Sequence, residues 1–319
     1  MRFSPGIYEH AAALIGRTPR EVSRDATLLA DAHAAAWARY RHPLVVAGID
    51  VYNLEPEAYG AVVDTPMGNE VPSITTRPCA EIENLADLTP LKPLAHARIR
   101  GVLAAGKALV DRCRGAEVRI PVCGPFALGM GLVGLDALLM ATVEDPNALN
   151  AALEHLLAGQ VNYLRAIHAA GLRPIFFESG TCPPLLPAQS FARIEAPLLK
   201  RLFAVSHELF REAPPCVIGG DAALIAKHLF ETGPGWVIAP SETDQTAFME
   251  TAQAYPEIHV RVNLPATLLL ENNPRALEAG ARRAVDLARR HPNTSVGCGV
   301  VPFETRPETI LHLQTIVES

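Results

Sequence analysis

The chain has 319 residues, of which 49% are hydrophobic and 19% charged, and its formal net charge is −6 with an isoelectric point near 6.0. This composition is typical of a helix-rich α/β protein, and the net negative charge argues against a nucleic-acid surface, which needs clustered Lys and Arg. No apolar run approaches the roughly 18 residues of a membrane span, and MRFSPGIYEH lacks a signal-peptide pattern. We therefore expect a cytoplasmic protein that acts on a small molecule and binds neither nucleic acid nor membrane.

The six cysteines form no CxxC pair, so the sequence predicts neither a disulfide framework nor a zinc ribbon. We expect reduced thiols at these positions, which are Cys79, Cys113, Cys123, Cys182, Cys216 and Cys298.

Short runs rich in Val and Ile alternate with longer helical patterns, such as residues 145–171, which is typical of a parallel sheet built from strand–helix units. We interpret the chain as one domain, a TIM-type (β/α)8 barrel over residues 41–319 with a helical extension over residues 1–40. An eighth strand is not evident, and residues 61–93 are read as a long excursion near the site. The seven predicted strands are residues 42–50, 117–124, 173–179, 215–220, 236–241, 258–264 and 294–299.

The end of the first predicted strand carries a dense group of polar side chains. In such a barrel the chemistry lies on the loops after the carboxyl ends of the strands, so we expect these residues to line the site. The alternative is that the acidic residues stabilise the start of a helix whose first turn contains Pro56. The group comprises Asp50, Tyr52, Asn53, Glu55 and Glu57.

Two further strand ends are candidates. The second ends in PVCGPFALG, where Gly124 allows close backbone approach and Phe126 follows; it matches no phosphate-binding motif, and packing is the alternative role. At the end of the third, Glu178 and Ser179 directly follow an apolar run, so we expect Glu178 to have a shifted pKa and a catalytic role. The alternative is that Glu178 forms a salt bridge with a loop.

The later strands add Ser241 and Asn263 as substrate-binding candidates, since each ends a predicted strand. Asp221 follows PPCVIGG and is a catalytic candidate, although it could instead cap the helix that begins at Ala222.

Several of these segments together resemble the uroporphyrinogen decarboxylase superfamily: GIDVYNLEPEAYG, PVCGPFALGMGLVG, FFESG and SVGCGVVPFETRPETI. The resemblance covers most of the chain and implies one barrel. True uroporphyrinogen decarboxylases begin with an Arg-rich segment of the type RQAGRYLPEY, which is absent here. The chain looks closer to the branch of corrinoid-dependent methyltransferases similar to methylcobalamin:coenzyme M methyltransferase.

In that branch, zinc held by His-x-Cys and a distant Cys activates a thiol. The distant position matches Cys298, but the His-x-Cys position falls on Val217 and Gly219. Cys216 does not repair the motif, because side chains alternate along a strand and Cys216 points to the opposite face. We therefore expect no zinc, the alternative being a site rebuilt from Cys298, Glu178 and Asp221.

The resemblance implies a corrinoid-dependent methyltransferase, with Glu178, Asp221 and the loop from Tyr52 to Glu57 placing a small acceptor such as a thiol or tetrahydrofolate, and an acidic group moving the proton. No cobalamin-binding module is visible, so the corrinoid would come in trans on a small partner protein, and the chain could form a homodimer. The alternatives are a decarboxylase of a carboxylated substrate and a non-catalytic ligand-binding barrel.

Overall fold

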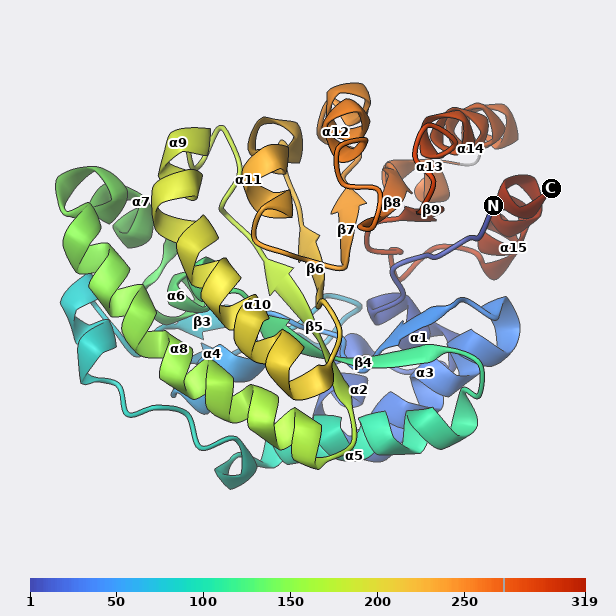
Figure 1. Cartoon of the computed structure of the whole chain (residues 1–319). Coiled ribbons are helices and arrows are strands. Elements are labelled where there is room, and N and C mark those ends of the chain that lie inside the picture. Colours follow the sequence, from blue (N-terminus) through green and yellow to red (C-terminus); the bar gives the residue numbers. More distant parts are fainter. Residues whose placement is uncertain (272) are drawn as a thin grey trace.

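Seven parallel strands form one curled sheet whose order follows the chain (Figure 1). The structure is a computed structural model that describes residues 1–271 and 273–319. All seven predicted strands are present, and each is shorter than predicted at one or both ends. The sheet runs through β1 (Leu44–Val46), β4 (Glu117–Cys123), β5 (Arg173–Glu178), β6 (Pro215–Ile218), β7 (Trp236–Ala239), β8 (His259–Leu264) and β9 (Thr294–Cys298).

Helices cover the outer face of this sheet. The predicted helical segment 145–171 is α8 (Pro146–Ala169), which packs beside α10 (Ala196–Phe210). The other α-helices are α1 (Glu9–Leu14), α2 (Pro19–Arg24), α3 (Ala26–Tyr40), α4 (Leu54–Ala58), α5 (Ala97–Arg112), α6 (Pro125–Val133), α7 (Leu135–Glu144), α9 (Ala188–Ser190), α11 (Ala226–Phe230), α12 (Gln245–Ala252), α13 (Thr267–Leu270), α14 (Pro274–Ala288) and α15 (Pro307–Glu318).

The expected eight-stranded closed barrel is corrected by the structure, because no eighth strand joins β1 to β9 among the described residues. The N-terminal segment lies along β9 instead, through two isolated parallel bridges, Phe3 with Val296 and Gly6 with Val300. The backbone N–H groups of Ser4 and Gly6 donate to Val296 and Cys298 at 2.8 and 3.2 Å, whereas Pro5 between them has no N–H to donate to a further strand on its other side. The two chain ends lie side by side, and the Phe3 N–H donates to Glu318 at 3.3 Å (Figure 1).

Gly297 on β9 allows this segment to approach the sheet. A Cβ at position 297 would lie 2.1 Å from the Ser4 carbonyl oxygen and 2.8 Å from Arg261 Cδ. We expect Gly297→Ala to destabilise the protein by about 1–3 kcal/mol, because the backbone of Ser4 would have to move.

The matched control is Gly299→Ala, since a Cβ at position 299 meets nothing within 4 Å. Urea unfolding of both variants measures the difference, and equal midpoints for the two would contradict the role of Gly297.

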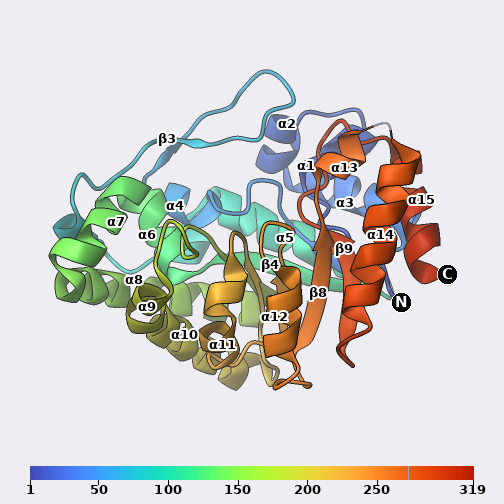
Figure 2. The ribbon, with the colours of Figure 1, turned by 90° about the horizontal axis from the view of Figure 1, so that it is seen from above.

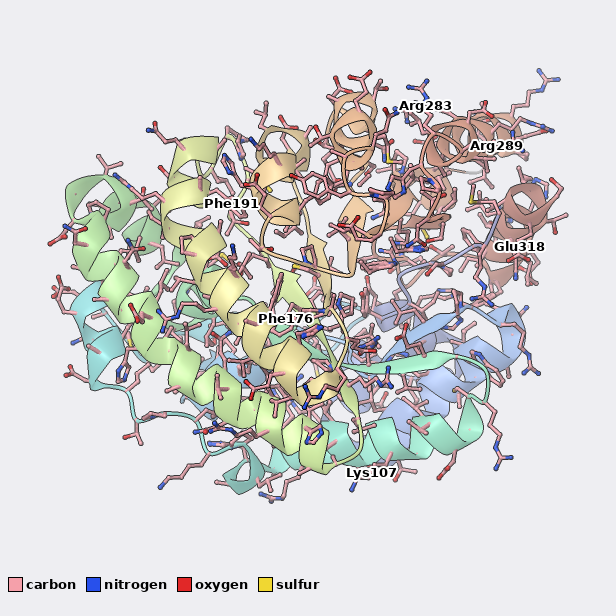
Figure 3. All side chains as sticks on the ribbon, in the orientation of Figure 1. Lys107, Phe176, Phe191, Arg283, Arg289 and Glu318 are labelled. Carbon is pink, nitrogen blue, oxygen red and sulfur yellow. The ribbon has the colours of Figure 1, made fainter. Side chains whose placement is uncertain are left out.

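Side chains on the strands alternate between the lumen of the curled sheet and the helix layer. On β5, Ile175 and Phe177 face the lumen with Tyr8 and Val46, whereas Phe176 packs in the main core against Phe203 of α10. Figure 3 shows Phe176 and Phe191 inside the molecule and Lys107, Arg289 and Glu318 at its periphery. The lumen and the helix layer are therefore two separate environments at each strand end.

The irregular excursion 61–93 contains β2 (Val62–Val63), which pairs antiparallel with β3 (Ile74–Thr76), and the 3₁₀ turns η1 (Ile82–Asp87) and η2 (Pro93–Ala95). Figure 2 shows this segment reaching beyond α4 and α6 towards α2, where Arg20 contacts Met67. Among the described residues no single helix is long and apolar enough to cross a membrane. Only α6 and α7 taken together have the required length and composition, and they are bent by 114° relative to each other.

Candidate active site

A cavity of about 530 Å³ lies at the carboxyl ends of the strands, and we call it the mouth cavity. Asp50, Tyr52, Asn53, Ser241 and Asn263, all predicted site residues, line it. Its other lining residues are Tyr8, Glu9, Ile49, Val51, Val71, Pro72, Phe177, Val217, Gly219, Ile238, Pro240, Glu242, Arg261, Ala266, Gly299 and Val300. The excursion therefore does reach the site, through Val71 and Pro72.

Asp50 is the most firmly held carboxylate of the mouth cavity. It is 6% exposed, its Oδ2 accepts a hydrogen bond from Asn53 Nδ2 at 2.9 Å, and its Oδ1 forms an ion pair with Arg98 of α5. Burial raises the pKa of Asp50, and the Arg98 charge opposes that rise. The second amide hydrogen of Asn53 is donated to the Pro72 carbonyl at 2.6 Å, which ties the excursion to this loop.

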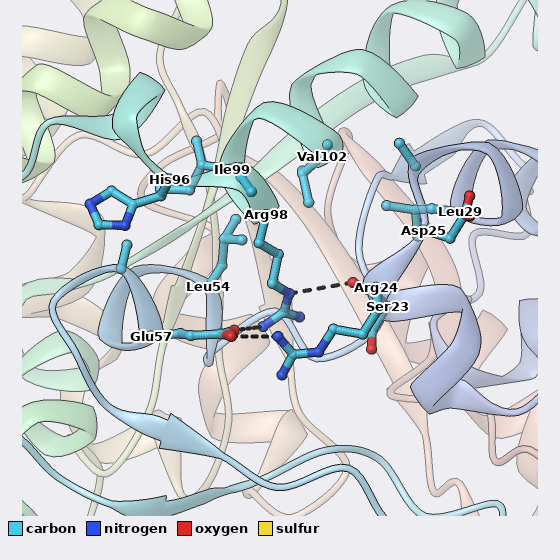
Figure 4. Close-up of a pocket in the computed structure, with 14 residues that line it drawn as sticks. Ser23, Arg24, Asp25, Leu29, Leu54, Glu57, His96, Arg98, Ile99 and Val102 are labelled. Carbon is cyan, nitrogen blue, oxygen red and sulfur yellow. Dashed lines mark hydrogen bonds and ion pairs between the residues drawn. The ribbon is translucent and has the colours of Figure 1, made fainter.

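Glu57 faces away from the mouth cavity into a second cavity of about 390 Å³ between α2, α4 and α5 (Figure 4). There it forms ion pairs with Arg24 and with Arg98, the latter at 2.6 Å. Burial raises the pKa of Glu57, but the hydrogen bonds from the two arginines outweigh it and lower the pKa overall. Arg98 thus joins Glu57 in the second cavity to Asp50 in the first.

Glu178 lies in the helix layer rather than in the mouth cavity, because its neighbour Phe177 takes the lumen face of β5. It is fully buried, and its Oε1 accepts hydrogen bonds from the backbone N–H groups of Ala127 at 2.7 Å and Ser179 at 3.0 Å. Glu178 therefore pairs with the first turn of α6, where free N–H groups favour a carboxylate.

Glu195, which sequence reasoning missed, forms a carboxyl pair with Glu178. It ends the π-helical turn η3 (Phe191–Glu195) and is also fully buried. Burial raises the pKa of both groups, most strongly for Glu195, whose carboxyl hydrogen-bonds that of Glu178. With both ionised, Glu178 Oε2 and both oxygens of Glu195 would lack a donor, so the pair holds one shared proton.

Gly124, Phe126 and Ser179 belong to the surroundings of this pair. A Cβ at Gly124 would lie 1.6 Å from Glu178 Oε2, so only glycine fits there. Phe126 is fully buried and does not line the mouth cavity, and neither does Ser179. These substrate-binding candidates thus lie behind the cavity wall, against Glu178.

Tyr52 lines the mouth cavity, whereas Glu55 lies outside it, behind the residues that form the cavity wall. The Tyr52 hydroxyl donates to the Glu178 carbonyl at 3.3 Å, and burial raises its pKa well above the usual value, so it stays protonated. Glu55 is buried outside the mouth cavity, where its Oε2 accepts from the Cys123 N–H, and burial raises its pKa to about 8.

Asp221 is held by the loop after β7. Its Oδ1 accepts a hydrogen bond from Thr243 Oγ1 at 2.7 Å, and that hydroxyl in turn accepts from the Ala223 N–H at 2.7 Å. Asp221 occupies the N-cap position of the 3₁₀ turn η4 (Ala222–Ile225), but its side chain makes no capping hydrogen bond. Thr243 supplies that cap instead, and Asp221 does not line the mouth cavity.

Tyr8 and Arg261 are among the polar lining residues of the cavity that sequence reasoning missed. Arg261 is the only charged residue of IHVRVNL, two positions before Asn263, so strand alternation places both on the lumen face. Tyr8 lies in the segment that the sequence presents as a helical extension, and no local signal marks it as a cavity residue.

The residues present do not fit the zinc site that the resemblance implies. Val217 and Gly219 line the mouth cavity at the His-x-Cys positions, as strand alternation predicts, while Cys216 is buried in the main core. Cys298 is also in that core, and burial raises its pKa to about 11, which disfavours a thiolate. Over residues 1–271 and 273–319, no group of three His, Cys, Asp or Glu could hold a metal ion.

We expect dialysis against a chelator to leave both the thermal midpoint and the activity unchanged, because no zinc ligand set is assembled at the cavity. Elemental analysis checks this directly. If about one zinc per chain survives the chelator, the expectation fails, and Glu178, Asp221 and Cys182 are the ligands to test.

The model of the uroporphyrinogen decarboxylase (URO-D) family matches residues 6–319. Among solved structures, a methyltransferase from Methanosarcina mazei superposes with a TM-score of 0.84 at 18% identity, covering 99% of this chain and 91% of that one. A provisionally named vitamin-B12-independent methionine synthase from Listeria monocytogenes gives a TM-score of 0.51 at 14% identity, covering 92% and 86%. No curated protein matched the sequence. Because the family model spans nearly the whole chain, the chain belongs to the uroporphyrinogen decarboxylase family.

Proposed function

We propose that the chain is an enzyme that transfers a methyl group between a corrinoid protein, acting in trans, and a small acceptor bound in the mouth cavity, such as a thiol or tetrahydrofolate. The observation that carries this proposal is the placement of Asp50, a buried carboxylate that lines the cavity and is held through both oxygens. The names of the two similarly folded proteins, a methyltransferase and a methionine synthase, support methyl transfer as the reaction class.

Asp50 is suited to accept the acceptor's proton. When a thiol is methylated, its sulfur forms the new bond to carbon, its proton must leave, and the electron pair of the broken bond stays with the methyl donor. Burial raises the pKa of Asp50, which makes it a better base than an exposed aspartate, while Arg98 and Asn53 fix its direction. Asn263 and Ser241 face the same space and can orient the acceptor.

The size of the cavity favours delivery of the methyl group from outside. About 530 Å³ suits a small acceptor, and it lies within the usual range for ligand pockets. A methylated corrinoid supplies an electrophilic methyl group, whether it is free or bound to a carrier protein. On this proposal the carrier docks over the open end of the mouth cavity, near Val71 and Val300.

Purified protein mixed with methylcobalamin and a thiol or tetrahydrofolate acceptor tests the proposal. We expect the absorption of the cobalt–carbon bond to change only when both acceptor and protein are present. A reaction that proceeds equally without the protein, or no change with any acceptor, rejects methyl transfer. Ligand binding without turnover would favour a non-catalytic barrel.

Decarboxylation is the second candidate, and a specific observation favours it: Arg261 in the mouth cavity forms no ion pair with a carboxylate among the described residues, so it could hold a carboxylated substrate. Asp50 in its protonated form would then protonate the carbanion left by loss of carbon dioxide. Release of carbon dioxide from a carboxylated substrate, with no change in methylcobalamin, separates this reaction from methyl transfer.

A further inference from the structure

We propose that the mouth cavity binds its acceptor through a carboxylate head group held by Arg261, Tyr8 and Asn263, so that the acceptor is a small carboxylic acid. The inference rests on the proposed function in taking this cavity as the acceptor site. It adds the chemical class of the ligand and the residues that select it.

Arg261 is fixed in place by its neighbours. It is 4% exposed, its Nε donates to Asn263 Oδ1 at 2.9 Å, and its Nη1 donates to the Ser4 carbonyl at 3.2 Å. Its Cζ lies 4.9 Å from the centroid of the Trp236 ring, a cation–π contact. The guanidinium plane is therefore oriented before any ligand arrives, which lowers the entropic cost of binding.

The same guanidinium has donors to spare. A guanidinium carries five N–H groups, and the two hydrogen bonds above use two of them. Within residues 1–271 and 273–319, Nη2 has no hydrogen-bond partner and is not fully buried. Since Arg261 lines the mouth cavity and its Nε and Nη1 are engaged by Asn263 and Ser4, we infer that Nη2 is the donor available to a ligand there.

Two further donors face the same space. The Tyr8 hydroxyl forms no hydrogen bond in the described part of the chain, and burial raises its pKa to about 12, so it keeps its proton. Asn263 Nδ2 is likewise unpaired there, and its orientation is set because Oδ1 accepts from Arg261. Tyr8, Arg261 and Asn263 all line the mouth cavity, and Arg261 and Asn263 are joined by a hydrogen bond, so one ligand in that cavity has all three within its surroundings.

Among residues 1–271 and 273–319, no acid forms an ion pair with Arg261. Asp50 is committed to Arg98 and Asn53, Glu242 accepts from Ser241 Oγ, and Glu9 forms no ion pair with Arg261. Burying an unpaired cation is unfavourable, and a carboxylate ligand would offset that cost with a bidentate, charge-assisted pair. A neutral ligand would leave the cost uncompensated, so the site selects an anion.

The chain provides its own reporter for this binding. Its tryptophans are Trp37 and Trp236, and Trp236 lies on Arg261, so Trp37→Phe leaves one indole at the proposed site. In this background we would titrate 3-mercaptopropionate and its neutral amide, 3-mercaptopropanamide, and follow Trp236 fluorescence. We expect saturable binding of the acid, at least about 10-fold tighter than the amide and weakened by salt.

Arg261→Met should weaken binding of the acid at least about 10-fold and leave binding of the amide unchanged. Arg261→Lys should retain part of the preference for the acid, because it keeps the positive charge but not the paired N–H donors of the guanidinium. Arg24→Gln is the matched control, because it removes one positive charge from the second cavity only. If Arg261→Met does not fold, Arg261→Lys and Tyr8→Phe, checked by circular dichroism, still test the head-group contacts.

The proposal is overturned if the acid shows no saturable binding, if the amide binds as tightly, or if Arg24→Gln weakens the acid as much as Arg261→Met. Selective binding of the acid without methyl transfer would support this inference and reject the proposed function. Methyl transfer to uncharged thiols that is unchanged by Arg261→Lys would do the reverse.

Discussion

Asp50→Asn should lower kcat for methyl transfer by roughly 100-fold or more, because removal of a general base commonly has an effect of this size. Asparagine has the shape of aspartate and its Oδ1 can still accept from Arg98, but the ion pair is lost and its Nδ2 would face the Nδ2 donor of Asn53, so circular dichroism must accompany the kinetics to check the fold. The pH profile gives a second measure. The raised pKa of Asp50 predicts an acidic limb above the usual range for aspartate, and Asp50→Asn should remove that limb.

Glu242→Gln is the control for Asp50→Asn. Glu242 also lines the mouth cavity, but it is exposed and contacts only Ser241 Oγ, so its replacement should change kcat little. Steady-state kinetics over pH 5 to 9 on all three proteins decide the matter. Near-normal turnover in Asp50→Asn would remove Asp50 from the proposed mechanism.

The second large effect concerns the Glu178–Glu195 pair and the free energy of unfolding. Burial raises the pKa of Glu195 far above its ordinary value, so the native protein keeps a proton that the unfolded chain releases. The stability that this proton provides is fully present below the unfolded pKa near 4.5 and is lost as pH rises towards the folded pKa. One retained proton lowers the free energy of unfolding by about 1.4 kcal/mol per pH unit in that window.

Glu195→Gln should remove this slope. Glutamine carries permanent N–H donors, so it can donate to Glu178 at any pH without retaining a titratable proton. We therefore expect the variant to gain stability over the wild type as pH rises from 5 to 8, by several kcal/mol at the upper end. Other buried acids such as Glu55 contribute equally to both proteins and cancel in the difference.

Urea unfolding of both proteins at several pH values measures this slope. Glu154→Gln serves as the control, because Glu154 is an exposed partner of Arg201 and its loss should leave the slope as it is in the wild type. Parallel curves for the wild type and Glu195→Gln would contradict a shared proton in the pair.

The strands could be predicted from the sequence because each is an apolar run bounded by helical patterns, and the cavity residues Asp50 and Asn263 followed from their places at strand ends. Glu178 also ends a strand, yet it lies behind the wall. The alternation that correctly put Cys216 opposite Val217 would have put Glu178 opposite Phe177, had it been applied along β5. A residue's position at a strand end thus predicts that it lies at the carboxyl edge of the sheet. Its odd or even place along the strand decides whether its side chain faces the lumen or the helix layer.

The partners of these residues could not be predicted in the same way. Arg98 reaches Asp50 across 48 positions of sequence, and Arg98 lies in the first turn of α5 without any motif. Glu195 meets Glu178 beside the backbone of Phe126 in α6, although η3, α6 and β5 are separate segments of the sequence. Such contacts depend on how helices are stacked over the strands, which hydrophobic periodicity does not specify.

The bridges between residues 3–6 and β9 have a consequence for how the molecule is completed during synthesis. Almost the whole described chain separates Phe3 from Val296, so this contact closes a very long loop and is expected to form late. Until it forms, β9 has an unpaired edge, a surface on which strands of other chains can add. Tyr8 and the Ser4 carbonyl behind Arg261 arrive with the same segment, so a half-made chain has neither a finished edge nor a finished pocket. Assembly of the binding site and protection from aggregation are thus one event, and a ligand that binds there would favour both.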